Sequence, residues 1–71
     1  MNVELLVSMA NDIAAFWDAE AGEGAAEGVR SHISRYWEPR MRREIIAHLQ
    51  KGGAGLTSTA RSAIEKLAPV A

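Results

Sequence analysis

The sequence contains no cysteine, and this absence removes several kinds of chemistry at once. Without a thiol, the chain has no disulfide framework, no thiolate metal site and no cysteine nucleophile. A reducing compartment is compatible with such a composition. Long apolar runs are missing as well, because no segment approaches the ~20 consecutive apolar residues that span a bilayer.

We expect no secretory signal peptide in the first residues of this sequence. Glu4 stands where a signal peptide carries basic residues, and the early apolar run is broken by Ser8, Asn11 and Asp12. We therefore expect a soluble, cytoplasmic chain without a membrane partner.

Basic residues are absent from the first 28 positions, which carry a net charge of −6. Residues 29–51 carry +4, so the overall net charge of −1 hides a strong asymmetry. Two interpretations remain open. The acidic and basic elements pair with each other inside a bundle, or the basic face is kept for an acidic partner.

The apolar residues recur at helical spacing, with no strand-like alternation. With 71 residues, the chain is long enough for one small domain, 1–71. We predict an all-α fold, a small bundle of three to four short helices with a Pro-initiated third helix. The helices are expected at about 3–19, 25–37, 39–50 and 58–68.

Local signals set these boundaries. Asn2 is a candidate N-cap for the first helix, and Pro39 fits the first turn of a helix but not its interior. Gly52 and Gly53 follow the third helix, where a left-handed C-terminal cap needs no Cβ. Thr57 or Ser58 can cap the fourth helix, which is expected to run through Ala68 and to be ended by Pro69. In the second helix, four side chains are expected to face the core: Ala25, Val29, Ile33 and Tyr36.

The first helix is unusually apolar. On a helical wheel its apolar residues cover about 200°, against ~100° or somewhat more for an ordinary surface helix. Either the other three helices wrap around it, or part of its surface binds an outside partner. The Ala-rich fourth helix is expected to be weakly anchored. A chain this small is also expected to be marginally stable in isolation or to self-associate.

The segment RYWEPRMRREIIAHL, residues 35–49, combines two aromatics with four of the eight basic residues. Such a stretch can stack on nucleic-acid bases or bind a protein. On the wheel, Arg42 lies within the apolar arc of the third helix, in position for an ion pair with Glu38 or for a partner carboxylate. Arg40 and Arg43 project from the opposite side. A pI of about 6.1 disfavours nucleic-acid binding.

Catalytic and metal-binding patterns are nearly absent. His32 and His48 are interpreted as histidines at the edge of the core, because no carboxylate cluster completes a metal site. The segment KGGAGLTST lacks the order of a phosphate-binding loop. We therefore expect no enzyme activity from this chain alone.

Two segments carry a family resemblance, LLVSMANDIAAFW (residues 5–17) and HISRYWEPRMRREIIAHL (residues 32–49), together with the GGAGL turn. They resemble the small delta subunit of soluble NAD-dependent formate dehydrogenases. The most specific part is WEPRMR, similar to the family's Phe-Trp-Asp-Pro-Arg-Met-Arg. Tyr36 replaces Phe and Glu38 replaces Asp, and the second change weakens the N-cap.

The resemblance implies a non-catalytic accessory subunit of a cytoplasmic complex that oxidises formate to carbon dioxide and reduces NAD. Its expected partners are the molybdopterin-containing catalytic alpha subunit and, through it, the beta and gamma subunits. The molybdenum or tungsten pterin, the iron–sulfur clusters and FMN are expected on those larger subunits, with no cofactor on this chain. Candidate partner-binding residues are Phe16, Trp17, Tyr36, Trp37, Arg40, Met41 and Arg42. The alternative is a small nucleic-acid-binding or regulatory protein that uses residues 35–43.

Overall fold

The computed structural model describes residues 2–69 and is helical almost throughout this range. Its elements are α1 (Val3–Ala21), the short 3-10 helix η1 (Gly22–Gly24), α2 (Ala25–Tyr36), α3 (Pro39–Gln50) and α4 (Ser58–Glu65). No β-strand occurs in residues 2–69. The predicted all-α bundle with a third helix beginning at Pro39 is therefore confirmed. Of the expected domain 1–71, positions 1, 70 and 71 lie outside the described residues.

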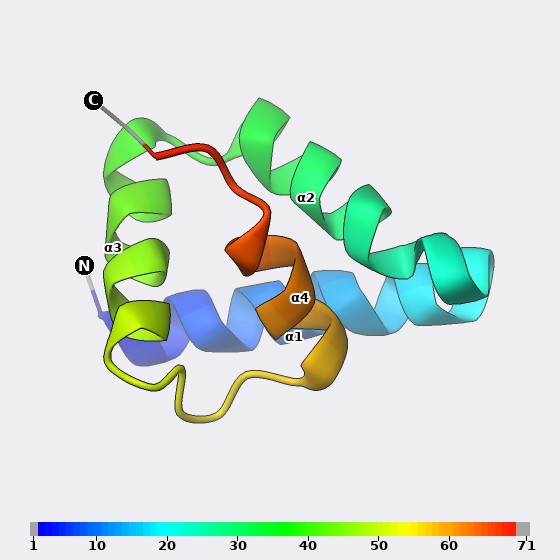
Figure 1. Ribbon diagram of the computed structural model, residues 1–71, viewed down its shortest axis with the longest axis horizontal. Helices are drawn as coiled ribbons and strands as arrows, with labels where there is room; N and C mark the ends of the chain where they lie inside the picture. Colours follow the sequence, from blue (N-terminus) through cyan, green and yellow to red (C-terminus); the bar gives the residue numbers. More distant parts are fainter. Residues whose placement is uncertain (1, 70–71) are drawn as a thin grey trace.

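Three helices frame the fourth (Figure 1). α2 turns back over α1, α3 runs across the beginning of α1, and α4 lies between them. α4 packs against each of the other three helices, so the predicted weak anchoring of this helix is wrong. Its Ala60, Ala63 and Ile64 are all buried. The small alanine side chains allow close approach of neighbouring helices, because interaxial distance depends on the side chains at the contact.

The local signals for helix ends act as predicted. The Asn2 side chain accepts a hydrogen bond of 2.8 Å from the Glu4 amide and caps α1. Gly52 and Gly53 have positive φ angles of 117° and 66°, and the Gly53 amide donates to the His48 carbonyl at 3.0 Å. Such a bond satisfies one of the carbonyls that the end of α3 leaves without an intrahelical partner.

The cap of α4 is Thr57, whose hydroxyl accepts a hydrogen bond of 3.2 Å from the Ala60 amide. α4 ends at Glu65, earlier than the expected end at Ala68. The next two amides, of Lys66 and Leu67, donate to carbonyls three residues back. Bonds of this spacing are those of a 3-10 turn, which is tighter than an α-helix. Leu67 remains buried beyond the end of the helix.

The corner between α2 and α3 differs from the prediction in one important respect. Tyr36 was expected to face inward, but its side chain is 69% exposed, whereas Trp37 is only 5% exposed. Buried residues on α2 recur every four positions, at Ala25, Val29 and Ile33, and the next step of four is residue 37. Trp37 and Glu38 then have extended backbones before Pro39 opens α3.

Part of the apolar surface of α1 is not buried in the core. Leu6, Ala10 and Ala14 are fully buried, but Leu5 and Phe16 are 55% and 58% exposed. The other helices therefore leave one side of α1 uncovered. Within residues 2–69, no helix is both long enough and apolar enough to cross a membrane.

Candidate protein-interaction surface

The most distinctive feature of the surface is a group of rings shared by α1 and α2. We call Phe16, Trp17, His32 and Tyr36 the aromatic surface. The Phe16 and Trp17 rings meet edge to face with centroids 5.5 Å apart, and the His32 and Tyr36 rings lie 4.8 Å apart. Two shallow hollows of about 310 and 450 Å³ open here, and both are lined by Trp17 and His32.

A glycine on α2 makes room for this arrangement. The Trp17 ring lies so close to Gly28 that a Cβ at position 28 would come within 2.5 Å of two ring carbons. Only glycine allows the indole to approach the backbone of α2 this closely. Packed against this backbone, Trp17 forms a half-buried floor, and Phe16 beside it remains exposed to solvent.

The structure brings together three of the seven predicted partner-binding residues, Phe16, Trp17 and Tyr36. The remaining four lie on or near the α2–α3 corner. Trp37 is buried there as part of the hydrophobic core. Met41 packs partly against the core, and Arg40 is exposed with a long contact of 3.9 Å to Glu44.

Arg42 closes the corner. Its Nη1 donates a hydrogen bond to the Trp37 carbonyl at the end of α2, where a cation is also favoured by the helix dipole. No ion pair joins Glu38 and Arg42 among residues 2–69, so the predicted pair is not formed. The pair is absent because the Arg42 guanidinium extends past Glu38 and bonds to the carbonyl of the residue before it, Trp37.

Sequence reasoning missed two members of this region, Gly28 and His32. His32 was interpreted only as a histidine at the edge of the core, but its spacing of four from Tyr36 is the signal that places both rings on one side of α2. Gly28 offered a weaker signal, a glycine inside a helix, where it is unfavourable without a packing reason.

The ion pairs show how far the acidic and basic segments pair with each other. Within residues 2–69, the ion pairs are Arg30–Glu27 on α2 and Arg40–Glu44 on α3, each inside a single helix. No ion pair joins acidic α1 to basic α3 in this part of the chain. The Arg30–Glu27 pair does join the acidic residues 1–28 to the basic residues 29–51, but only where the two segments meet on α2.

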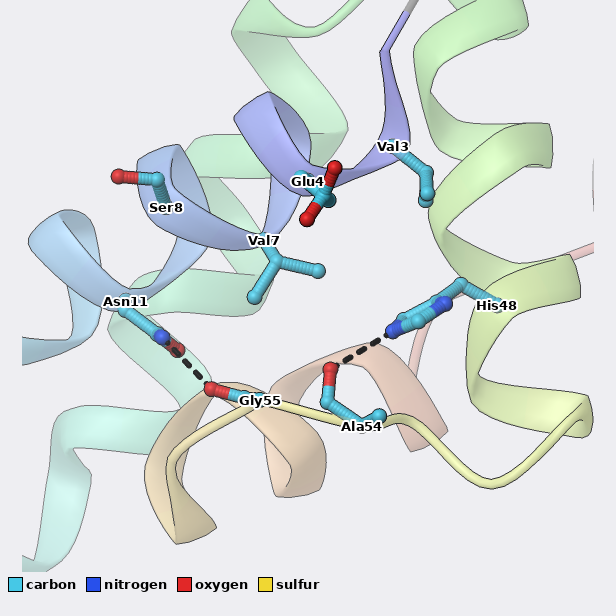
Figure 2. A pocket seen from close by; sticks show the side chains of 8 residues that line it. All are labelled: Val3, Glu4, Val7, Ser8, Asn11, His48, Ala54 and Gly55. Atoms are coloured by element: carbon cyan, nitrogen blue, oxygen red, sulfur yellow. Dashed lines mark hydrogen bonds between the residues drawn. The ribbon is translucent and has the colours of Figure 1, made fainter.

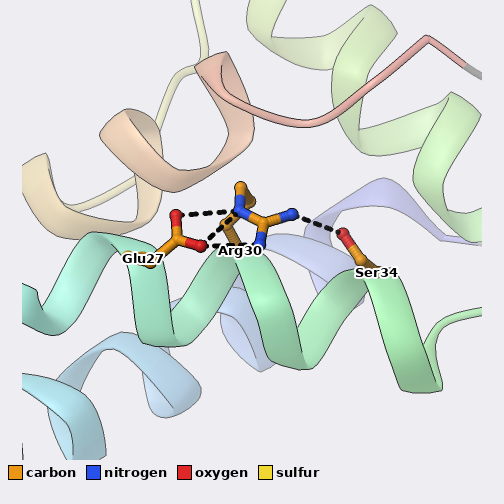
Figure 3. Close-up of polar contacts among 3 residues, drawn as sticks. All are labelled: Glu27, Arg30 and Ser34. Atoms are coloured by element: carbon orange, nitrogen blue, oxygen red, sulfur yellow. Dashed lines mark hydrogen bonds and ion pairs between the residues drawn. The ribbon is translucent and has the colours of Figure 1, made fainter.

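The Arg30–Glu27 pair is the best-formed one (Figure 3). Arg30 donates from Nη2 to the Glu27 carboxylate at 2.6 Å and from Nη1 to the Ser34 hydroxyl at 3.4 Å. Hydrogen bonding by this guanidinium lowers the pKa of Glu27 below its ordinary value of 4.5, and the carboxylate raises the pKa of Arg30. The pair is exposed and stabilises a solvated face of α2.

A third hollow, of about 490 Å³, lies between α1, α3 and the loop before α4 (Figure 2). Two of its polar side chains, Asn11 and His48, are already bonded within the fold. Asn11 donates to the Gly55 carbonyl at 2.9 Å and accepts from the Thr57 amide at 3.0 Å, and His48 is bonded to the Ala54 carbonyl at 2.8 Å. The glycine loop is therefore held as a structural link. Within the described range, no three His, Asp or Glu side chains gather as metal ligands.

Fold and surface together define a class of protein, a small helical bundle with an exposed aromatic surface of the kind that marks interaction sites. The chain matches the family model of the NADH-dependent formate dehydrogenase delta subunit FdsD over residues 5–64. It belongs to this family, which confirms the resemblance seen in the sequence. No curated protein and no solved structure gives a significant match.

Proposed function

We propose that this chain is a non-catalytic accessory subunit that binds the catalytic alpha subunit of a cytoplasmic NAD-dependent formate dehydrogenase. Through that contact it supports assembly or stability of a complex that also contains the beta and gamma subunits. The family match over residues 5–64 is the observation that carries this proposal. The aromatic surface supplies a physical means of binding.

The aromatic surface has the composition of an interface centre. Aromatic side chains are enriched at such centres, and a few of them contribute most of the binding free energy. Phe16 and Tyr36 are more than half exposed, so a partner would remove much of their area from water. Trp17 is half-buried and forms the base of the surface on which these two rings lie. These three residues are the contacts we propose from the predicted set.

Arg40 and Met41 lie on α3, so direct contact through them requires a partner that also reaches the α2–α3 corner. Trp37 and Arg42 support the corner from inside, and their predicted direct contact stays a prediction. In the proposed complex, the molybdenum or tungsten pterin, iron–sulfur clusters, FMN and NAD belong to the larger subunits. Formate oxidation would then take place there, with two electrons passed to NAD.

Co-purification with the complete complex tests this proposal. The chain is co-expressed with the larger subunits, one of which carries an affinity tag, and retention of Phe16→Ala and Tyr36→Ala variants is compared with wild type. Loss of a binding anchor costs about 2 kcal/mol, which corresponds to a decrease in affinity of about 30-fold. Arg43→Ala, at an exposed position on α3, is the matched surface control.

Circular dichroism confirms that each variant remains helical. Retention of both aromatic variants at wild-type level would exclude the aromatic surface as the contact. Failure of the wild-type chain to co-purify with any subunit would overturn the proposed function itself.

The geometry disfavours the nucleic-acid alternative. A stacking platform requires exposed aromatic faces beside the cations. Trp37 is buried and Arg42 is bonded to its carbonyl, so residues 35–43 present a single exposed ring, Tyr36, for stacking. A steep loss of DNA affinity with salt would be needed to restore this alternative.

A further inference from the structure

The uncovered side of α1 has a regular spacing. Leu5, Met9, Asp12 and Phe16 follow one another at steps of four, three and four residues. Steps that alternate between three and four place side chains in one line along a helix, as in the seam between two paired helices. We call these four residues the α1 seam. It is apolar except at Asp12.

The seam is open to solvent in the isolated chain. Leu5 and Phe16 are each more than half exposed, Asp12 is exposed and Met9 is half-buried. The seam also continues into the aromatic surface, because Asp12 and Phe16 line the smaller hollow together with Trp17 and His32. A helix laid along the seam would therefore reach the proposed binding surface.

Asp12 determines what that helix must carry. Covering the seam would remove water from the Asp12 carboxylate, which is costly unless an opposite charge or hydrogen-bond donors replace the water. The chain places no lysine or arginine beside Asp12 on α1, and His32, which lines the same hollow, forms no ion pair with it among residues 2–69. No basic residue occurs on α1, and Asp12 takes part in no ion pair within residues 2–69.

A second copy of the chain fits the seam poorly. In a two-fold symmetric dimer the same patch faces itself, so two α1 helices would bring Asp12 of each copy into one interface. Glu20 lies four residues beyond Phe16 and adds another negative charge to the same side. Like charges within an interface disfavour association. A polar residue within an otherwise apolar seam is a known means of selecting the partner.

We infer that the α1 seam binds a helix of a larger formate dehydrogenase subunit that presents an arginine or lysine opposite Asp12. This inference rests on the proposed function and specifies the chemistry of the partner. The apolar residues of the seam supply contact area, and the ion pair fixes the register of the two helices.

Charge variants in the co-expressed complex test the inference. Asp12→Lys places a cation opposite the partner's cation, and we expect affinity to fall at least about 10-fold. Asp12→Asn keeps the size and polarity of the side chain, and we expect a smaller loss. Glu65→Lys makes the same charge change at an exposed residue on α4, away from the seam, and is expected to bind as wild type.

Salt dependence and self-association provide two further measurements. Wild-type binding should weaken with ionic strength more steeply than binding of Asp12→Asn. Asp12→Leu completes the apolar seam, and sedimentation of the isolated chain should show stronger self-association than wild type. Wild-type affinity in Asp12→Lys, or tighter binding, would overturn the inference while leaving the proposed function in place. A wild-type chain that binds no subunit would overturn both.

Discussion

The Trp17 indole lies directly on the backbone of Gly28, with no space for a side chain at position 28. This contact joins α1 to α2 and sets the floor of the aromatic surface. We therefore expect both the stability of the fold and the proposed binding to depend on the same glycine.

Gly28→Ala should displace the Trp17 ring. Overpacking of this kind costs about 1–3 kcal/mol, and the better helix propensity of alanine offsets up to ~1 kcal/mol of that. We expect a net loss of stability in urea unfolding, a changed tryptophan fluorescence spectrum and weaker retention in the complex. Gly24→Ala is the control, because its added Cβ meets only the Ala21 Cβ at 3.7 Å. Wild-type stability and fluorescence for Gly28→Ala would contradict the packing described.

Arg42→Ala should destabilise the corner between α2 and α3. The variant loses the charged donor to the Trp37 carbonyl, and hydrogen bonds to charged groups contribute about 1.5–3 kcal/mol. Arg43→Ala and Glu38→Gln should each have little effect, because neither side chain holds the corner. Urea unfolding of the three variants checks this. Equal losses for Glu38→Gln and Arg42→Ala would instead favour the ion pair expected from the sequence.

Asn11→Ala should loosen the loop before α4. The Asn11 amide both donates to the Gly55 carbonyl and accepts from the Thr57 amide, and two such bonds together contribute about 1–3 kcal/mol. Hydrogen exchange at the Thr57 amide should become faster. Ser8→Ala, one turn earlier on the same exposed side of α1, is the control. Unchanged exchange at Thr57 would show that the loop is held by its other contacts.

The titration of Glu27 should report its pairing with Arg30. Carbon NMR of the carboxyl group is expected to give a pKa below 4.5 in the folded chain, and Arg30→Gln should bring it back toward 4.5. Because the folded-state pKa is lowered, the pair stabilises the fold above the ordinary pKa of Glu. That contribution is lost as the pH falls through the lowered pKa. A pKa unchanged by Arg30→Gln would show that the guanidinium is not its cause.

The isolated chain should be only marginally stable. A single core in a domain of this size supplies about 3–5 kcal/mol, and part of the apolar surface of α1 remains exposed. Thermal unfolding below about 60 °C, with a midpoint that rises when the larger subunits are present, is the expected result. A concentration-independent monomer transition well above that temperature would refute the prediction.

Much of the fold could be predicted from local signals. Asn2, Pro39 and the pair Gly52 and Gly53 act through their own backbone conformations or nearest neighbours, so their effects do not depend on distant parts of the chain. The core-facing residues of α2 followed from spacing as far as Ile33. The first helix was correctly expected to have more apolar surface than one packing face requires.

The candidate site was only partly predictable. Phe16, Trp17 and Tyr36 were chosen as interface residue types, but nothing local separates them from Trp37, which belongs to the same types. Side chains at neighbouring helix positions differ in direction by about 100°. An error of one position in extending the core-facing residues of α2 therefore assigns the buried position to Tyr36 and not to Trp37. Gly28 gained its role only when Trp17 packed across it.

The sequence by itself determined that this chain is helical, where its turns fall and to which family it belongs, because these depend on short-range propensities and on the order of residues. The tertiary structure decided which surfaces remain free. α4 packed against all three other helices, Arg42 became part of the corner, and one side of α1 stayed uncovered. Those outcomes depend on how four helices share a limited core, which is a property of the whole chain.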